Sequence, residues 1–274
     1  MDSLAKTLSK YQLNAKKSLG QHFILDPSLC SKIVRSAGSL DQFTVIEIGP
    51  GIGGLTRALL QNGAKRVVAV ERDKRCLQAL NEISTIWPGR LKIINADALN
   101  TDLSKNIVGP IKIISNLPYN IGTALLLEWL KTPHRFFSLT LMFQKEVATR
   151  ILASPGKKDY GRLSVMAQWC CYTNHLFDIN PTAFTPPPKV NSSLIQLTPR
   201  EVPIFPTDRD SLEKVTLAAF GHRRKMLRTN FKNIFEYPEI LLRENGIDPT
   251  ARAETLTIEQ FCKLSRQLSQ TIDP

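Results

Sequence analysis

From residue 44 onward, short apolar runs alternate with stretches whose apolar residues recur at helical spacing. Runs of this kind, rich in Val, Ile and Leu, predict the buried strands of a sheet. We expect strands at residues 44–48, 66–70, 91–94, 112–114, 139–143, 174–179 and 194–197. Helices are expected at residues 28–37, 53–60, 74–86, 123–130 and 145–152.

Alternating strands and helices at this spacing predict an α/β fold with a mostly parallel, seven-stranded, Rossmann-like sheet. The last two strands are joined by a proline-rich loop instead of a helix, which indicates an antiparallel edge. Pro199, Pro203 and Pro206 then mark a linker, after which only helical patterns follow. We therefore expect a catalytic domain over residues 1–200 and a small helical domain over residues 201–274, with helices at 210–220, 225–234, 238–244 and 258–269.

The composition narrows the class of protein. No apolar run approaches the 20 or so residues needed to span a bilayer, and the Lys-rich N-terminus lacks the apolar stretch of a signal peptide. The five cysteines form no Cys-x-x-Cys pair and the four histidines have no metal-ligand spacing. We expect a cytoplasmic protein with reduced thiols and no metal.

The net charge is +12, and its placement is uneven. Residues 201–274 contain 11 basic and 11 acidic residues, so the whole excess lies in the first 200 residues. A basic field of this kind favours a polyanionic partner such as a nucleic acid.

The segment Glu47–Gly54 reads Glu-Ile-Gly-Pro-Gly-Ile-Gly-Gly and follows the first expected strand of the sheet. Glycines there let the backbone approach a ligand, and the next helix presents free N–H groups. The segment fits the dinucleotide fingerprint Gly-x-Gly-x-x-Gly and equally the Glu-x-Gly-x-Gly-x-Gly form of S-adenosylmethionine (SAM) methyltransferases. This motif alone leaves both cofactors open.

Two acidic residues follow the next strands. Glu71 ends the strand at 66–70, where a carboxylate reaches ribose hydroxyls, and Asp73 competes for the same role. Asp97 follows the strand at 91–94 and could accept a hydrogen bond from the amine of an adenine. Because parallel strands end at one edge of a sheet, Gly49, Glu71 and Asp97 should lie around one ligand.

The motif Asn116-Leu117-Pro118-Tyr119 separates the two cofactor classes. Pro118 fixes the backbone and lacks an N–H, so neighbouring carbonyls can face a cleft. The Asn116 amide oxygen, these carbonyls and the Tyr119 ring would then meet. Such a set suits a planar base with an NH₂ group, because the ring stacks on the base and the acceptors hold the amine hydrogens. A dehydrogenase has no use for it.

This motif, placed after the fourth strand, resembles the ribosomal RNA adenine dimethyltransferase family. The resemblance extends from about Asn14 to Leu268. Two positions depart from the usual family sequence, since His22 replaces Asn and Ile24 replaces Leu. The further matching segments are residues 17–26, 144–148, 160–165, 183–190, 220–225 and 246–249.

The resemblance implies a SAM-dependent enzyme that releases S-adenosylhomocysteine. It implies dimethylation of two adjacent adenosines in the 3′-terminal hairpin loop of 16S rRNA, within a small-subunit precursor. The catalytic residues would be Asn116, Leu117, Pro118, Tyr119 and Phe184, with Phe184 covering the second face of the base. The cofactor-binding residues would be His22, Ile24, Gly49, Gly51, Glu71, Asp97, Ala98 and Asn116.

We further expect a monomer that contacts RNA phosphates through basic side chains. The candidates are Lys16, Lys17, Arg150, Arg162, Lys189, Arg223, Arg224, Lys225 and Arg228. Three alternatives remain open at this point: a relative that acts on large-subunit RNA or on DNA, an assembly factor without turnover, and an NAD oxidoreductase. Leu117, where DNA adenine methylases usually have Pro, argues against the DNA reading.

Overall fold

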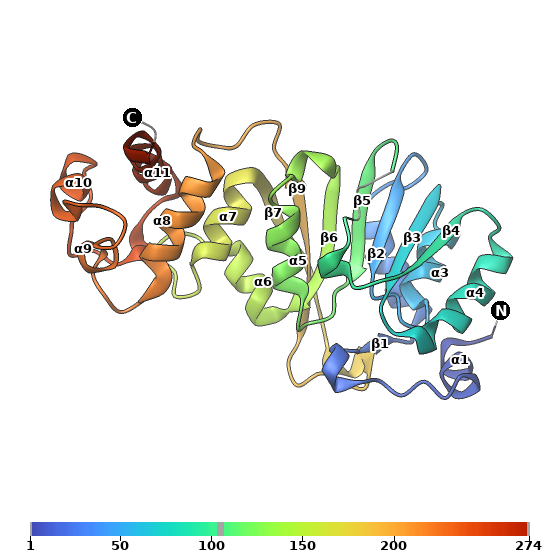
Figure 1. The fold of residues 1–274 in the computed structure, drawn as a ribbon. Coiled ribbons are helices and arrows are strands. Elements are labelled where there is room, and N and C mark those ends of the chain that lie inside the picture. The colour runs from blue at the N-terminus through green and yellow to red at the C-terminus, as the bar shows by residue number, and fades with distance from the viewer. Residues whose placement is uncertain (1, 103–106, 273–274) are drawn as a thin grey trace. The chain divides into compact units, whose positions relative to one another are not determined.

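The structure, a computed structural model, describes residues 2–102 and 107–272 (Figure 1). The chain forms two compact units. The first contains residues 1–148 and 174–199, and the second contains residues 149–173 and 200–274. The division differs from a single boundary at residue 200, because helix α7 (Arg162–Cys170) packs against α8 (Arg209–Gly221) of the C-terminal part.

The chain forms a seven-stranded sheet with the strand order β4-β3-β2-β5-β6-β9-β7. Strands β2 to β6 are parallel, and β9 is antiparallel to β6, which confirms the expected mostly parallel sheet with an antiparallel edge. A separate pair joins β1 (Phe23–Ile24) to β8 (Phe184–Thr185). The seven strands are β2 (Thr44–Ile48), β3 (Arg66–Glu71), β4 (Leu91–Asn95), β5 (Ile111–Asn116), β6 (Ser138–Gln144), β7 (Cys171–Ile179) and β9 (Ser192–Pro199).

The central strands are buried on both faces, which explains their continuous apolar sequences. In β3, the residues from Val67 to Val70 are each at most 3% exposed. Figure 1 shows β6, β5, β2, β3 and β4 side by side. Ile33, Leu59 and Ile83 come from three different helices and belong to the same core cluster as residues of β3. The apolar stripes of the helices therefore stabilise the sheet.

The helices up to residue 152 lie close to the expected ranges, except α1, which was not expected. Helix α2 begins where Asp26 Oδ1 accepts a hydrogen bond from the Ser28 N–H at 2.8 Å. The helix expected at 74–86 consists of a 3-10 turn, Lys74–Cys76, followed by α4. The helices are α1 (Leu4–Lys10), α2 (Pro27–Ser36), α3 (Gly54–Gln61), α4 (Leu77–Ile86), α5 (Gly122–Trp129) and α6 (Lys145–Leu152). The other 3-10 turns are Lys17–Leu19, Ala98–Asn100, Pro133–Arg135, Pro181–Ala183 and Ala253–Thr255.

The second unit is helical. Besides α7 and α8 it contains α9 (Leu227–Asn230), α10 (Pro238–Glu244) and α11 (Ile258–Ile272), and α8 packs against α11. Helix α9 is shorter than the expected 225–234. Its last residue, Asn230, closes the end of α8, because its Nδ2 donates to the carbonyls of Ala219 and His222 at 2.7 and 3.2 Å. Within the described ranges, no helix has the length and apolar character needed to cross a bilayer.

Helix α4 offers a test of this packing. Ile83 is fully buried, so Ile83→Ala should lower the free energy of unfolding by about 2–5 kcal/mol. Ile86 on the same helix is 47% exposed, so Ile86→Ala should change it by no more than about 0.5 kcal/mol. Urea denaturation measures both values, and equal losses would contradict the burial of α4 described above.

Candidate active site

A pocket opens at the carboxyl ends of β2, β3, β4 and β5, with about 730 Å³ of space between its lining atoms. This edge is where ligands bind in parallel α/β sheets. Every expected cofactor residue except Ile24 lines it; Ile24 lines a smaller adjoining pocket. The lining residues are Leu19, Gly20, Gln21, His22, Phe23, Ile48, Gly49, Gly51, Val70, Glu71, Arg72, Ala96, Asp97, Ala98, Asn116, Leu117, Pro118, Tyr119, Asn120 and Ile121.

The turn after β2 presents backbone to the pocket. Gly49 and Gly51 have φ angles of 64° and 55°, in the left-handed region that favours glycine. A Cβ on Gly51 would lie 2.6 Å from Cε1 of Phe23, so a larger residue would push this ring away. The N–H of Gly51 donates to Glu71 Oε2 at 2.9 Å. The glycines therefore allow a close approach that no side chain would permit.

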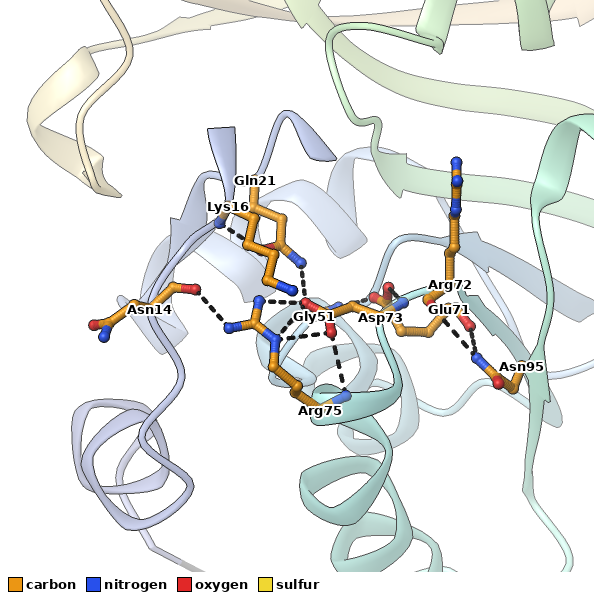
Figure 2. Close-up of polar contacts among 9 residues, drawn as sticks. All are labelled: Asn14, Lys16, Gln21, Gly51, Glu71, Arg72, Asp73, Arg75 and Asn95. Carbon is orange, nitrogen blue, oxygen red and sulfur yellow. Dashed lines mark hydrogen bonds and ion pairs between the residues drawn. The ribbon is translucent and has the colours of Figure 1, made fainter. Parts of the chain in front are cut away.

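Glu71 and Asp73 have different partners (Figure 2). Glu71 lines the pocket and accepts hydrogen bonds from the N–H groups of Gly51 and Asp73, while burial raises the pKa of its carboxyl group. Asp73 accepts from Arg75 Nη2 at 2.6 Å and from Gln21 Nε2 at 3.1 Å. The bonds from Arg75 chiefly hold the pKa of Asp73 at about 2. The structure thus places Glu71, and not Asp73, at the pocket.

The loop after β4 places Asp97 at the pocket rim. Its Oδ1 accepts from the Leu99 N–H at 3.1 Å, and its Oδ2 pairs with Arg72 Nη1 at 3.0 Å. Asn95 Nδ2 donates to the Glu71 carbonyl at 2.7 Å, which ties this loop to the end of β3 (Figure 2). Arg72 and Asn95 were not among the predicted residues. They could not be predicted from the sequence because their contacts depend on the strand register, which pairs Glu71 with Asn95.

Asn116 ends β5 and has a defined amide orientation. Its Nδ2 donates to the backbone carbonyl of His22 at 3.0 Å, so Oδ1 is the atom left to accept a hydrogen bond from a ligand. The Pro118 carbonyl accepts from the N–H groups of Ile121 and Gly122 at 3.1 and 3.0 Å. These bonds start helix α5 and fix the turn that follows Leu117.

Tyr119 lines the same pocket and is fixed by two neighbours. Its phenol oxygen lies 2.5 Å from Ser192 Oγ, and its ring centroid lies 5.2 Å from that of His22, with 31° between the ring planes. Burial raises the pKa of the phenol, so Tyr119 is neutral near pH 7. His22 Nδ1 donates to the Pro186 carbonyl at 2.7 Å. Ser192 is 73 positions away in the chain, and no local sequence signal pointed to it.

Phe184 has different surroundings from the other expected catalytic residues. It is 3% exposed, belongs to the apolar core cluster of the sheet and is absent from the described lining of the pocket. The cause is the pairing of β8 with β1, in which Phe184 pairs with Ile24. Its expected place at the second face of the base stays a prediction.

Comparison with known proteins identifies the family. Residues 12–270 match the family model described as "Ribosomal RNA adenine dimethylase". The chain belongs to this family. The dimethylases are SAM-dependent enzymes, and the cofactor expected from the glycine turn, Glu71 and Asp97 is therefore SAM.

Individual relatives of the dimethylase family cover nearly the whole chain. "Ribosomal RNA small subunit methyltransferase A" from Rhodospirillum rubrum is 52% identical over 96% of this chain and 91% of its own length. The crystal structure of a dimethyladenosine transferase from Plasmodium falciparum is similar with a TM-score of 0.77 and 26% identity, covering 91% of this chain and 98% of that one. The 23S rRNA methyltransferase ErmE has a TM-score of 0.67 and 25% identity, covering 90% and 100%.

Some of the basic residues predicted to contact RNA are bonded to other groups of the protein, and others are exposed to solvent. Arg162 pairs with Glu213, and Arg228 pairs with Glu239 at 3.1 Å. Arg223 Nη2 donates to the carbonyls of Lys158 and Tyr160, both at 2.7 Å. The structure does not describe the side chain of Lys17. The remaining candidates are exposed: Lys16, Arg150, Lys189, Arg224 and Lys225.

Glu47, the first residue of the glycine motif, is buried at 2% exposure and lines the smaller pocket with His22 and Asn116. Its Oε2 accepts from Thr56 Oγ1 at 2.6 Å. Burial raises the pKa of Glu47 to about 8, with a further contribution from the charge of Glu71. The carboxyl group is therefore mostly protonated at pH 7 in the protein alone.

This proton makes stability depend on pH. Between the ordinary pKa of 4.5 and about 8, folded Glu47 keeps a proton that the unfolded chain releases, so its contribution to stability falls as pH rises. Glu47→Gln has no carboxyl group to titrate. Its free energy of unfolding relative to that of the natural protein should therefore increase from pH 5 to pH 8.

Urea denaturation at pH 5, 6, 7 and 8, without ligand, measures this difference. As a control, Glu82 has a pKa lowered by Lys10 and Tyr11, so it is ionised in both the folded and the unfolded chain over this range, and the stability difference of Glu82→Gln should stay nearly constant from pH 5 to pH 8. A Glu47→Gln difference that is independent of pH would mean that Glu47 is already ionised in the folded protein.

Proposed function

We propose that this dimethylase transfers methyl groups from SAM to N6 of two adjacent adenosines in the 3′-terminal hairpin loop of 16S rRNA, on precursors of the small ribosomal subunit. The observation that carries the reaction type is the Asn116 amide, whose nitrogen is bonded to His22 and whose oxygen is left for an amine. The choice of small-subunit RNA is supported by the 52% identical relative, since the large-subunit enzyme ErmE is 25% identical.

The residues of the pocket fit SAM. Glu71 would accept from the ribose hydroxyls, and Asp97 from the adenine amine, with Ala98 beside it. The glycines at 49 and 51 allow close contact, because a Cβ at 51 would meet Phe23 at 2.6 Å. When bound, SAM supplies a methyl group on a sulfonium cation. His22 and Ile24 would line the methionine end.

Asn116 and Leu117 would hold the target amine. An adenine N6 is a poor nucleophile because its lone pair is delocalised into the ring. Asn116 Oδ1 and the Leu117 carbonyl can each accept one N6 hydrogen, which favours a pyramidal nitrogen. Positioning contributes much of the remaining rate, up to about 7–11 kcal/mol for well-aligned reactants. No strong general base is needed, since the methylated ammonium loses its proton readily.

Tyr119 would stack on one face of the target base, and Pro118 fixes the backbone that carries it. We do not assign Phe184 to the other face, because its ring is 3% exposed in the core. The base must leave its helix or lie unpaired in a loop, and phosphate contacts would offset this cost. The exposed basic residues Arg224 and Lys225 would supply part of them.

Asn116→Ala should lower the rate of methyl transfer at least about 100-fold, because the amine loses its side-chain acceptor. The assay uses labelled SAM and immature small subunits that lack the modification, followed by nucleoside mass spectrometry. Asn62→Ala is the matched control, since Asn62 bonds only to the Ala58 carbonyl of its own helix among its described partners. Wild-type transfer by Asn116→Ala would refute the proposal. So would transfer by the natural protein to large subunits but not to small subunits when both are offered.

RNA contact by the second unit is testable separately. Arg224→Ala with Lys225→Ala should weaken RNA binding about tenfold and lower the slope of log affinity against log salt by about 2. Arg223 is left intact because it bonds to two carbonyls of the fold. Lys65→Ala with Arg66→Ala, an exposed pair at the opposite end of β3, is the control. An unchanged slope for the 224/225 variant would remove these residues from the interface.

A further inference from the structure

The bond between Tyr119 and Ser192 has no role in the chemistry above, yet it is unusually well placed. Tyr119 lines the pocket, whereas Ser192 is fully buried and lies outside the described lining. The two oxygens are 2.5 Å apart, and the residues are 73 positions apart in the chain. Ser192 can therefore affect a ligand only through the phenol that it touches.

The sheet holds Ser192 rigidly. Ser192 is the first residue of β9 and pairs with Gln144 of β6, and the Lys145 N–H donates to the Asn191 carbonyl at 2.9 Å. The same strand β6 pairs Met142 with Asn116 of β5. One ladder of backbone hydrogen bonds thus fixes both Asn116 and Ser192. Because the serine side chain is short, its hydroxyl has little freedom relative to Asn116.

Tyr119 depends on this anchor more than Asn116 does. It lies in the turn between β5 and α5, outside the strand ladder. Its ring contacts His22 at one side, and its only described side-chain hydrogen bond is the one to Ser192. The phenol is neutral, so it can donate to or accept from the serine. The bond therefore fixes the far end of the ring, and with it the direction of the ring axis, relative to the Asn116 amide.

We propose that Ser192 is a positioning residue that holds the Tyr119 ring in the position needed to stack on the target adenine. This role rests on the proposed function, in which Tyr119 stacks and Asn116 holds the amine. A base that tilts with a loose ring moves its N6 away from the Asn116 oxygen. Misplacement on the scale of 1 Å costs a large part of the rate of an aligned reaction.

The test is a double-mutant cycle. Ser192→Ala and Tyr119→Phe each remove the same bond from opposite sides, and each should lower kcat about tenfold. KM for SAM should stay within about twofold, because neither hydroxyl is assigned to the cofactor. Since both changes delete one interaction, the double variant should be no slower than either single variant.

Ser193→Ala is the matched control. Ser193 is the next residue of β9, is 2% exposed and donates to Asp178 Oδ1 at 2.7 Å, so the change also removes one hydrogen bond of a buried serine. It should leave kcat near the natural value. Thermal denaturation checks that every variant is folded, and Tyr119→Phe tests the same bond should Ser192→Ala fail to fold.

The outcomes separate this inference from the proposed function. Tyr119→Ala with full activity would overturn the stacking role of Tyr119 itself. An inactive Tyr119→Ala together with a fully active Ser192→Ala or Tyr119→Phe would leave stacking intact and refute positioning by Ser192. If the double variant lost kcat by the product of the two single losses, positioning by Ser192 would also be refuted, since Ser192 would then act independently of the phenol.

Discussion

Parallel strands end at the same edge of a sheet, and the whole pocket depends on this constraint. In-register pairing sets Ile48 beside Val70 and Glu71 beside Asn95. The glycine turn, the Glu71 carboxyl and the Asp97 loop are thereby brought together from separate parts of the chain. The pairing of Asn116 with Met142 extends the same edge toward the side where we propose that the target base binds. One ladder of backbone hydrogen bonds thus positions the groups proposed to hold the cofactor and those proposed to hold the target amine.

The same arrangement places the carboxyl groups of Glu47 and Glu71 where water has little access. Burial raises the pKa of both Glu47 and Glu71, and the charge of Glu71 also raises the pKa of Glu47. Two such groups destabilise the protein without ligand, because burial penalises their charged forms. A ligand that carries positive charge would offset this cost by favouring ionisation. A sulfonium cofactor bound nearby would therefore lower the raised pKa values of these two carboxyl groups.

The sequence predicted those features that depend on local pattern. The alternation of strands and helices, the glycine turn and the series Glu71, Asp97 and Asn116 all follow from short segments read one at a time. The sequence did not predict contacts between segments that are far apart in the chain. Phe184 is drawn into the core by the strand that contains Ile24, and Ser192 reaches Tyr119 only because β9 lies beside β6. Such contacts depend on register, which hydrophobic periodicity does not specify.

Position 22 shows why a departure from the family sequence need not disturb the site. Asn116 uses the backbone carbonyl of His22, which any residue supplies. The imidazole makes its own contacts, since Nδ1 donates to the Pro186 carbonyl and the ring lies against Tyr119. A carbonyl can only accept, so Nδ1 carries the proton and a neutral ring leaves its lone pair on Nε2. The substitution thus preserves the orientation of the Asn116 amide while it adds an imidazole ring to the residues that line the pocket.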